Sequence, residues 1–295
     1  MKRVILCPNP YRDKGLSAAR EAEAILKSVG LETVYCLPFR PEGGEQQFEQ
    51  FGVQCAPLQQ ELRSGDLVVA FGGDGTILHL ARFASVRKVP LLGVNLGSLG
   101  FMSELEVSEM HLLKRLASGK FRREKRMMLD VTVERDGRVI YTNRGLNDAV
   151  ITKGAVARVV RLRVSAGTEY LGHFSGDGVI VATPTGSTGY SLSAGGPIVE
   201  PTAQNFVISP ICAHTGFPKS FVLSAEGQVT VAPSERGRNK QVYLSVDGGK
   251  AFLLHQEDKV RICRSQHEIE LIRLTDKSVY QILHTKMTGG CDYEK

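Results

Sequence analysis

The residues best suited to chemistry form a short turn, Gly72-Gly73-Asp74-Gly75-Thr76, which follows the apolar run Leu67–Phe71. Glycines let a backbone approach a ligand closely, and the free amides at the start of a following helix attract anions. The turn therefore predicts a phosphate site lined by Gly72, Gly73, Gly75 and Thr76. Asp74 is unexpected there, because a carboxylate repels phosphate. It is suited to accept a proton or to hold a metal ion, although Asp also commonly caps helices.

A second stretch, Thr183–Pro197, consists largely of Gly, Ser, Thr and Pro and follows the apolar run Val179–Ala182. Hydroxyls and free amides at this density can hydrogen-bond phosphates or ribose hydroxyls. Tyr190 is the one large ring in the stretch and is suited to pack against a base. A flexible linker is the alternative, but linkers lack this mixture of Pro, Tyr and a flanking apolar strand.

Two further segments combine Asp with a predicted turn. Asn147-Asp148 pairs an amide that can read the edge of adenine with a carboxylate that can accept from ribose hydroxyls. A turn before a strand is the alternative there, because Asn and Asp are common turn formers. The segment Leu244–Gly249 is a strand that enters a hairpin turn, and a plain β-turn and a ligand contact fit it equally well.

Several other kinds of site are not indicated. The Asp74 turn is neither the dinucleotide fingerprint G-x-G-x-x-G nor a P-loop, which needs a Lys after its last Gly. The six cysteines are scattered without a Cys-x-x-Cys pair, so we expect no zinc site. Gly186–Gly189 lacks the G-x-S-x-G spacing of a serine hydrolase. His79, His173 and His214 each fit a structural role at least as well as a ligand contact.

Length and composition are those of a soluble protein, and 295 residues can hold two domains. The net charge of +6 suits a small molecule that carries polyphosphate, and the basic residues form no long stretch, so no nucleic-acid partner is expected. We interpret the densest basic cluster, Arg122–Arg126, as a solvated domain connection. The apolar runs are too short for a membrane span or an export signal, which predicts a cytoplasmic protein with reduced thiols and no membrane partner.

Residues 1–122 are predicted to form a Rossmann-like α/β domain with a mostly parallel sheet, because strand and helix patterns alternate. The expected strands are Arg3–Cys7, Glu32–Cys36, Leu67–Phe71 and Pro90–Val94, the expected helices are Leu16–Val29 and Glu109–Ala117, and Pro38–Pro57 is expected to be a loop with a short helix. Such sheets bind ligands at the carboxyl ends of their strands. The Asp74 turn and a second glycine turn, Asn95–Phe101, both fall there.

Residues 123–275 are predicted to form a mainly β domain resembling a β-sandwich, because short strands follow one another closely. The expected strands are Leu129–Glu134, Val139–Thr142, Ala157–Ser165, Val179–Ala182, Val229–Ala232, Val242–Val246, Ala251–Leu254, Val260–Cys263 and Glu268–Leu274. Ser278–Lys286 is predicted to be a helix, or else a strand. We expect residues 276–295 to pack back on the first domain.

Taken together, these motifs resemble those of the NAD kinase family of the bacterial type, in order and in spacing. They are Gly72–Thr76, Asn95–Phe101, Asn147-Asp148, Gly176-Asp177-Gly178 and Thr183–Pro197. The resemblance is strong over about residues 65–250. The Gly-Gly-Asp-Gly turn alone is shared with phosphofructokinases and lipid kinases, so the Thr-Pro-Thr-Gly-Ser-Thr segment is what narrows the resemblance.

The resemblance implies transfer of a phosphoryl group from ATP, or in some members from polyphosphate, to the 2′-hydroxyl of the adenosine ribose of NAD. It further implies a divalent metal ion such as Mg²⁺, a homodimer or homotetramer, and Asp74 as the proton acceptor. Asp74 and further residues would contact NAD. These are Gly75, His79, Asn147, Asp148, Arg158, Ser175, Asp177, Thr185, Thr188, Gly189, Tyr190, Ser191, Leu192, Ser193, Ala213 and Gly249.

The chain departs from the family pattern at two of these positions. Asp148 stands where the family usually has Glu, which shortens the reach of the carboxylate, and Gly189 stands where it usually has Ala. Two alternatives remain. A lipid or sugar kinase of the same Gly-Gly-Asp-Gly group is disfavoured by the Asn147-Asp148 pair and by the absence of an amphipathic membrane helix. A non-catalytic dinucleotide sensor is disfavoured by the presence of Asp74.

Overall fold

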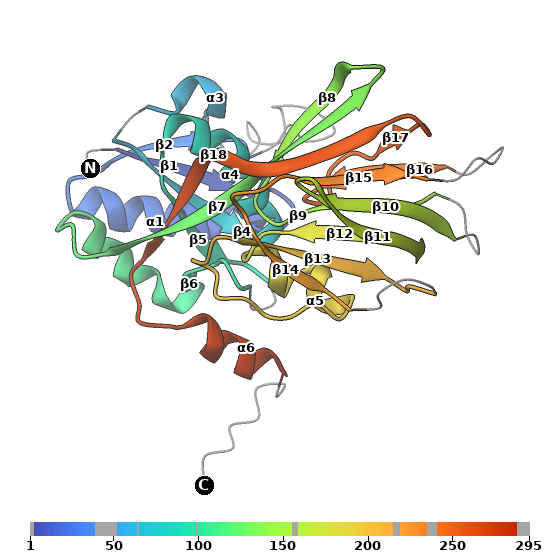
Figure 1. Cartoon of the computed structure of the whole chain (residues 1–295). Coiled ribbons are helices and arrows are strands. Elements are labelled where there is room, and N and C mark those ends of the chain that lie inside the picture. The colour runs from blue at the N-terminus through green and yellow to red at the C-terminus, as the bar shows by residue number, and fades with distance from the viewer. Residues whose placement is uncertain are drawn as a thin grey trace, which may run out of the picture. The chain divides into compact units, whose positions relative to one another are not determined.

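The chain divides into two units (Figure 1): residues 1–125 together with 269–295 form unit 1, and Arg126–Glu268 form unit 2. The computed structural model describes residues 3–38, 52–63, 65–97, 100–154, 159–214, 219–234 and 241–287. Two long strands, β7 (Arg122–Arg135) and β18 (Lys259–Arg273), contribute residues to both units.

Unit 1 contains a parallel sheet in the order β3-β2-β1-β4-β5, to which the end of β18 adds a parallel pairing with β5. These strands are β1 (Arg3–Pro8), β2 (Glu32–Cys36), β3 (Cys55–Ala56), β4 (Leu67–Gly72) and β5 (Leu91–Asn95), with the short β6 (Leu105–Glu106) beside β5. Every residue of β4 and β5 is buried, as expected of parallel strands that are covered on both faces. The strand order reverses between β1 and β4. The carboxyl ends of these two strands therefore form a switch point, where α/β sheets bind ligands.

Helices cover this sheet, and both predicted helices are confirmed with shifted ends. The first is α1 (Ser17–Ser28), preceded by the 3₁₀ turn η1 (Lys14–Leu16), and it buries Ala18, Ala19, Ala22 and Leu26 in the core. The second is η2 (Val107–Leu116), a 3₁₀ helix that begins earlier than expected because Glu106 and Glu109 form a capping box. Among its described residues, unit 1 also contains the helices α3 (Leu58–Glu61), α4 (Asp74–Arg87) and α6 (Val279–Met287). Most of the expected loop Pro38–Pro57 lies outside the described residues.

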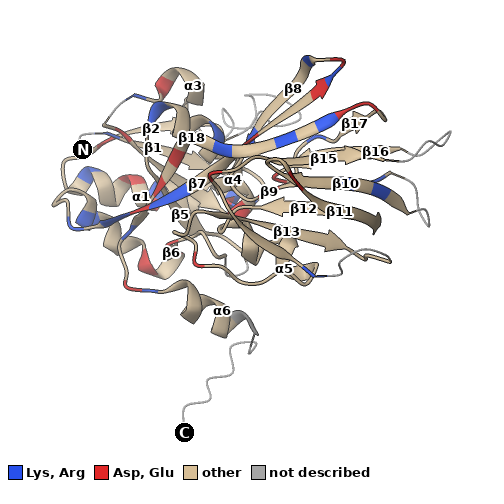
Figure 2. Ribbon diagram, viewed as in Figure 1, with Lys and Arg blue, Asp and Glu red and all other residues tan. Residues whose placement is uncertain are grey.

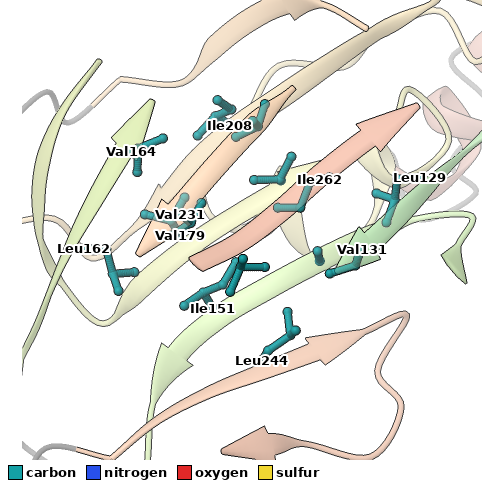
Figure 3. Packing of buried hydrophobic residues seen from close by; sticks show 14 of the residues in the cluster. Leu129, Val131, Ile151, Leu162, Val164, Val179, Ile208, Val231, Leu244 and Ile262 are labelled. Carbon is teal, nitrogen blue, oxygen red and sulfur yellow. The ribbon is translucent and has the colours of Figure 1, made fainter. Parts of the chain in front are cut away.

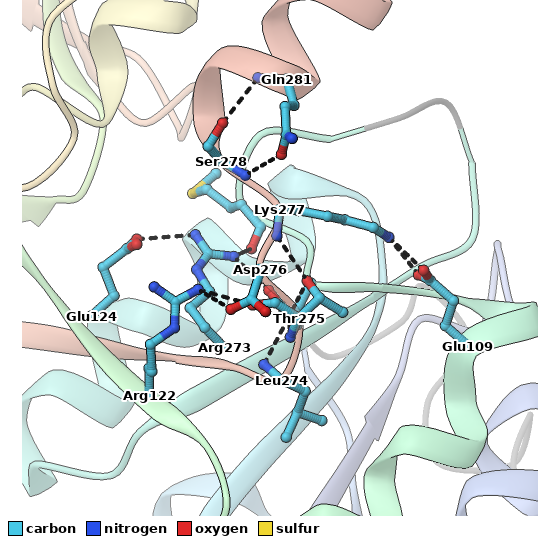
Figure 4. Close-up of polar contacts among 12 residues, drawn as sticks. Glu109, Arg122, Glu124, Arg273, Leu274, Thr275, Asp276, Lys277, Ser278 and Gln281 are labelled. Carbon is cyan, nitrogen blue, oxygen red and sulfur yellow. Dashed lines mark hydrogen bonds and ion pairs between the residues drawn. The ribbon is translucent and has the colours of Figure 1, made fainter.

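Polar contacts tie the chain after β18 into unit 1, and Figure 4 shows those around Arg273 and Thr275. The Oε1 atom of Glu104 accepts from the backbone amides of Leu274 at 2.7 Å and Thr275 at 2.6 Å. Arg273 donates to Glu104 Oε2 at 3.2 Å and to Glu124 Oε1 at 3.0 Å, and its side chain is only 9% exposed. Buried charges need such partners, because an unpaired one is expensive to desolvate.

The interpretation of Arg122–Arg126 as a solvated domain connection is correct for Arg122, Arg123 and Lys125, which are exposed, but it missed a strand and a buried arginine. These residues begin β7, and Arg126 is 3% exposed. Arg122 and Arg123 form ion pairs with Asp276 and Glu270. These two ion pairs join the start of β7 to acidic residues on the part of the chain that follows Glu268.

Unit 2 is mainly β, as predicted, and has two groups of antiparallel strands. One sheet has the order β14-β13-β12-β9-β16-β17, and in the other group β11, β10, β15 and β18 pair in that order while β7 pairs with β8. The strands not yet given are β8 (Arg138–Gly145), β9 (Asp148–Lys153), β10 (Val160–Ala166), β11 (Glu169–Gly176), β12 (Gly178–Ala182), β13 (Asn205–Ile211), β14 (Phe221–Ser224), β15 (Val229–Pro233), β16 (Val242–Val246) and β17 (Phe252–Leu254). Two short helices, η3 (Gly186–Thr188) and α5 (Tyr190–Ser193), follow β12.

The two groups of strands share one apolar core (Figure 3). Ile151, Val179, Ile208 and Leu244 of the six-stranded sheet belong to the same buried cluster as Leu129, Val131, Leu162, Val164, Val231 and Ile262 of the other strands. Strands β9, β11, β13 and β14 were not among the strands expected from the sequence. In β13 the interior Pro210 pairs with Val179, although Pro is depleted in strands and argues against one on sequence alone.

The charged residues are spread over several elements (Figure 2). Lys and Arg occur on α1, β7, β10 and β18, with acidic residues among them. Within the part of the chain that the structure describes, no helix has the length and hydropathy needed to cross a bilayer.

Candidate active site

The Asp74 carboxylate is held at the carboxyl end of β4 in unit 1. Gly73 is the residue before α4, and Asp74 is the first residue of the helix, so its side chain makes no capping bond and the capping alternative is wrong. The carboxylate accepts instead from the backbone amides of Phe101 at 2.8 Å and Met102 at 3.2 Å. A Cβ on Gly100 would lie 2.9 Å from the Asp74 Cγ atom, so the second glycine turn approaches Asp74 as closely as glycine allows.

In the rest of this turn, Gly72 and Thr76 are closely packed, whereas Gly73 and Gly75 have open space beside them. Thr76 is buried, and its hydroxyl accepts from Asn9 Nδ2 at 3.1 Å, while a Cβ on Gly72 would lie 3.0 Å from the Thr76 Cβ. A Cβ on Gly73 or Gly75 would meet no other described residue within 4 Å. The open amides of the predicted phosphate site are therefore those near Gly73 and Gly75. Asn9, which follows β1 at the switch point, was missed by the sequence analysis.

His79 lies one turn further along α4 than Gly75. Its ring centroid is 5.3 Å from that of Phe83. The ring hydrogen-bonds to the backbone carbonyl of Pro38, and burial, followed by the charge of Arg82, lowers the pKa of the imidazole. His79 is therefore a neutral aromatic side chain above its ordinary titration range.

In unit 2, Asp247 organises the Asn147-Asp148 segment. Its carboxylate accepts from three successive amides, those of Leu146 at 2.7 Å, Asn147 at 2.8 Å and Asp148 at 3.0 Å. Its own amide donates to the Asp148 carbonyl at 3.0 Å. Asp247 adopts φ = 50°, a left-handed conformation that Asp tolerates better than most residues. No local pattern indicates this contact, because about a hundred residues separate its partners.

Asn147 and Asp148 both present buried polar groups. The Asn147 Oδ1 atom has no hydrogen-bond partner among the described residues. Asp148 is 6% exposed, and burial, followed by the charge of Asp247, raises the pKa of its carboxyl to about 7. Buried polar atoms are rarely left without partners, so these two groups indicate a place where a polar ligand binds.

The hydroxyl-rich stretch is braced against the same segment. Thr183 donates its amide to the Asn147 carbonyl at 2.8 Å and its hydroxyl to the Leu146 carbonyl at 2.5 Å. A Cβ on Gly186 would lie 2.8 Å from the Asn147 Cα, so only glycine fits there without displacement. The stretch is thus an ordered element that packs on Asn147, and not a flexible linker.

Within this stretch the predicted ligand residues differ in exposure. Tyr190 is 47% exposed and Ser193 is exposed, while Thr188, Gly189 and Leu192 are half-buried. Ser191 is fully buried and its Oγ lies 2.9 Å from Ser209 Oγ. Thr185 is buried too, and its hydroxyl accepts from Arg126 Nη1 at 3.1 Å, a partner that the sequence analysis missed.

The other predicted residues of unit 2 lie in two places. Ser175 accepts from the His214 amide through its carbonyl, and a Cβ on the next residue, Gly176, would lie 3.0 Å from the Cα of Ala213, so Ser175 and Ala213 are neighbours. Asp177 forms an ion pair with Lys153 at 2.6 Å. Gly249 closes the turn after β16, with its amide donating to the Val246 carbonyl. Arg158 lies outside the described residues.

Comparison with known proteins shows the family to which the chain belongs. Residues 4–121 match the model of the ATP-NAD kinase N-terminal domain, and residues 146–274 match that of the ATP-NAD kinase C-terminal domain. The NAD kinase of Natranaerobius thermophilus is 37% identical over 293 residues, which cover 98% of this chain and 99% of that protein. That of Geotalea daltonii is 43% identical over 226 residues, covering 76% of this chain and 79% of the relative.

Solved structures share the fold. A crystal structure of yeast NADH kinase complexed with NADH has a TM-score of 0.82 at 23% identity and covers all of this chain and 89% of its own. The structure of an NAD kinase from Archaeoglobus fulgidus in complex with ATP has a TM-score of 0.71 at 23% identity, over 97% of this chain and 98% of its own. Both family models and the full-length relative agree, and the chain belongs to the NAD kinase family.

Proposed function

We propose that this protein is an NAD kinase that transfers a phosphoryl group from ATP to the 2′-hydroxyl of the adenosine ribose of NAD, which yields NADP. The observation that carries the proposal is the Asp74 carboxylate, which backbone amides hold beside the open glycines of a phosphate-binding turn. A ribose hydroxyl is a poor nucleophile at neutral pH. A positioned carboxylate that accepts its proton as the new P–O bond forms assists the attack.

The acceptor half of the proposal rests on unit 2. Asn147 and Asp148 bind the adenosine part of NAD, with the Asn147 Oδ1 atom accepting from the base and Asp148 contacting the ribose. Thr188, Gly189 and Tyr190 line the dinucleotide, and Asp177 lies toward its nicotinamide end. Asp148 is one methylene shorter than the usual Glu, so the ribose must approach it closely. The bonds from three successive amides to Asp247 support this role, because they fix the backbone on which both side chains stand.

The divalent metal ion is proposed to arrive with the donor as the Mg–ATP complex. Among the residues that the structure describes, no group of three or more His, Cys, Asp and Glu side chains could hold a metal ion. The ion then neutralises phosphate charge while the triphosphate oxygens supply most of its ligands. The family resemblance further supports a cytoplasmic homodimer or homotetramer, for which light scattering of the purified protein is the direct test.

The experiment that tests the function is an acceptor panel. Purified protein is incubated with ATP and Mg²⁺ and with NAD, NADH, sphingosine, diacylglycerol or fructose 6-phosphate, and each product is identified by mass. We expect NADP from NAD, or NADPH from NADH. Phosphorylation of the lipid or the sugar alone would place the protein elsewhere in the Gly-Gly-Asp-Gly group. Tight NAD binding without any NADP would make it a dinucleotide sensor.

A further inference from the structure

Unit 1 contains a cavity of 310 Å³ that the proposed roles of Asp74, Asn147 and Asp148 do not use. Its walls are the chain after β2 (Leu37 and Pro38), the segment from Cys55 to Gln60, and the side chains of His79 and Phe83 on α4. Ligand pockets in proteins span roughly 300–1,000 Å³, so this one lies at the small end. It suits a single ring system and not a whole dinucleotide.

The described residues that line the cavity are uncharged, and two of them, His79 and Phe83, are aromatic. None of the described residues that line the cavity is Asp, Glu, Lys or Arg. Phe83 and His79 present tilted rings, Pro38 and Pro57 add flat apolar surface, and Gln59 and Gln60 provide amides that can donate and accept. Because burial lowers the pKa of His79, its ring is neutral at pH 7. A flat, neutral heteroaromatic ring with polar edges, as in a nucleobase, matches these walls.

Helix α4 begins at the glycine turn and carries two of the residues that line the cavity. Gly75, His79 and Phe83 are spaced four residues apart, and such residues lie on one face of a helix. At about 1.5 Å per residue, each step along this stripe is about 6 Å. Gly75 is exposed, with open space where a side chain would stand, and it lies in the first turn of α4, where helix amides attract phosphate.

We propose that this cavity binds the base of the donor nucleoside triphosphate, whose phosphates run along the Gly75–His79–Phe83 face of α4 to the glycine turn. This inference rests on the proposed kinase function, since NAD is assigned to Asn147 and Asp148. It gives His79 a different role from the NAD contact implied by the family resemblance. His79 is here part of the wall that selects the donor.

The test separates donor from acceptor affinity. Phe83→Ala removes an aromatic wall, and Ala56→Leu narrows the cavity without removing a core side chain. Base–aromatic stacking contributes about 1–3 kcal/mol per base, so we expect Phe83→Ala to raise the KM for ATP about tenfold. The KM for NAD should stay at the wild-type value. Val86→Ala, on an exposed position of the same helix, is the matched control and should change neither constant.

Two further measurements keep the proposal refutable. Inorganic triphosphate lacks a base, so its inhibition constant against ATP should be the same in wild type and in both variants. If triphosphate binding weakened as much as ATP binding, the variants would have damaged the phosphate site, and the proposal would be overturned. An unchanged KM for ATP in both variants, or a rise in the KM for NAD instead, would also overturn it. Calorimetric titration of ATP without NAD tests the cavity even if the wild-type protein makes no NADP.

Discussion

Replacing Asp148 by Asn should stabilise the protein, and the gain should grow with pH. The native carboxyl is 6% exposed, and burial and then Asp247 raise its pKa from 3.8 to about 7. Between these two values the native state holds a proton that the unfolded chain has released. The free energy of unfolding therefore falls as the pH rises through this window and levels off above it. Three units at about 1.36 kcal/mol each give an upper limit of about 4 kcal/mol.

The assay is urea unfolding of wild type and Asp148→Asn at pH 5, 6, 7 and 8. Asn has the shape of Asp and does not titrate, so subtracting the two unfolding free energies removes most other titrating groups. We expect this difference to increase by about 2–3 kcal/mol in favour of the variant from pH 5 to pH 7 and to change little by pH 8. Asp136→Asn, in the exposed turn between β7 and β8, is the matched control and should show no such trend.

The reasoning would be refuted by a difference that stays constant with pH. That result would mean that the Asp148 carboxyl titrates near its ordinary pKa, and that its burial is compensated by contacts other than those described. The same variant should bind NAD more weakly, because it loses the carboxylate that is proposed to contact the ribose. When a residue is kept in an unfavourable environment because it binds a ligand, its substitution usually increases stability and weakens binding.

Three other substitutions test the supporting contacts. Gly186→Ala places a Cβ 2.8 Å from the Asn147 Cα, so it should cost about 1–3 kcal/mol in urea unfolding and raise the KM for NAD, and unchanged values would contradict the packing. Burial is the main cause of the raised pKa of Asp148, and the charge of Asp247 adds to it; Asp247→Asn keeps an acceptor oxygen but removes that charge, so the pH profile of NAD binding should shift to lower pH, and an unmoved profile would exclude that coupling. Glu104→Gln leaves the buried Arg273 with less counter-charge and should cost about 3–5 kcal/mol in unfolding free energy, whereas a cost below about 0.5 kcal/mol would show the pair to be dispensable.

Local patterns in the sequence account for the parts of the fold that were predicted. The buried run Leu67–Phe71 followed by glycines identifies β4 and the start of α4, because both signals lie within a few neighbouring residues. The same holds for α1, whose apolar spacing matches one face of a helix. The order and spacing of the motifs along the chain likewise indicate the family without any knowledge of the fold.

Long-range contacts account for what was not predicted. Arg122–Arg126 has the composition of a surface connection, and its first residues are exposed, but ion pairs with carboxylates after Glu268 accompany its pairing as the start of a strand. Asp247 is an ordinary turn residue until the fold places it against three amides from Leu146 to Asp148. The raised pKa of Asp148 depends on burial by many residues, and no local pattern carries it.

The role of Asp74 is the central claim, and one kinetic comparison tests it most directly. The kcat for NADP formation and the Kd for NAD are measured for wild type and for Asp74→Asn, which keeps the size of the side chain. A positioned general base contributes about 10²–10⁴-fold, so we predict a loss of kcat in that range with little change in the Kd for NAD. A variant that retains a kcat within about tenfold of wild type would contradict the assignment of Asp74 as the group that accepts the ribose proton.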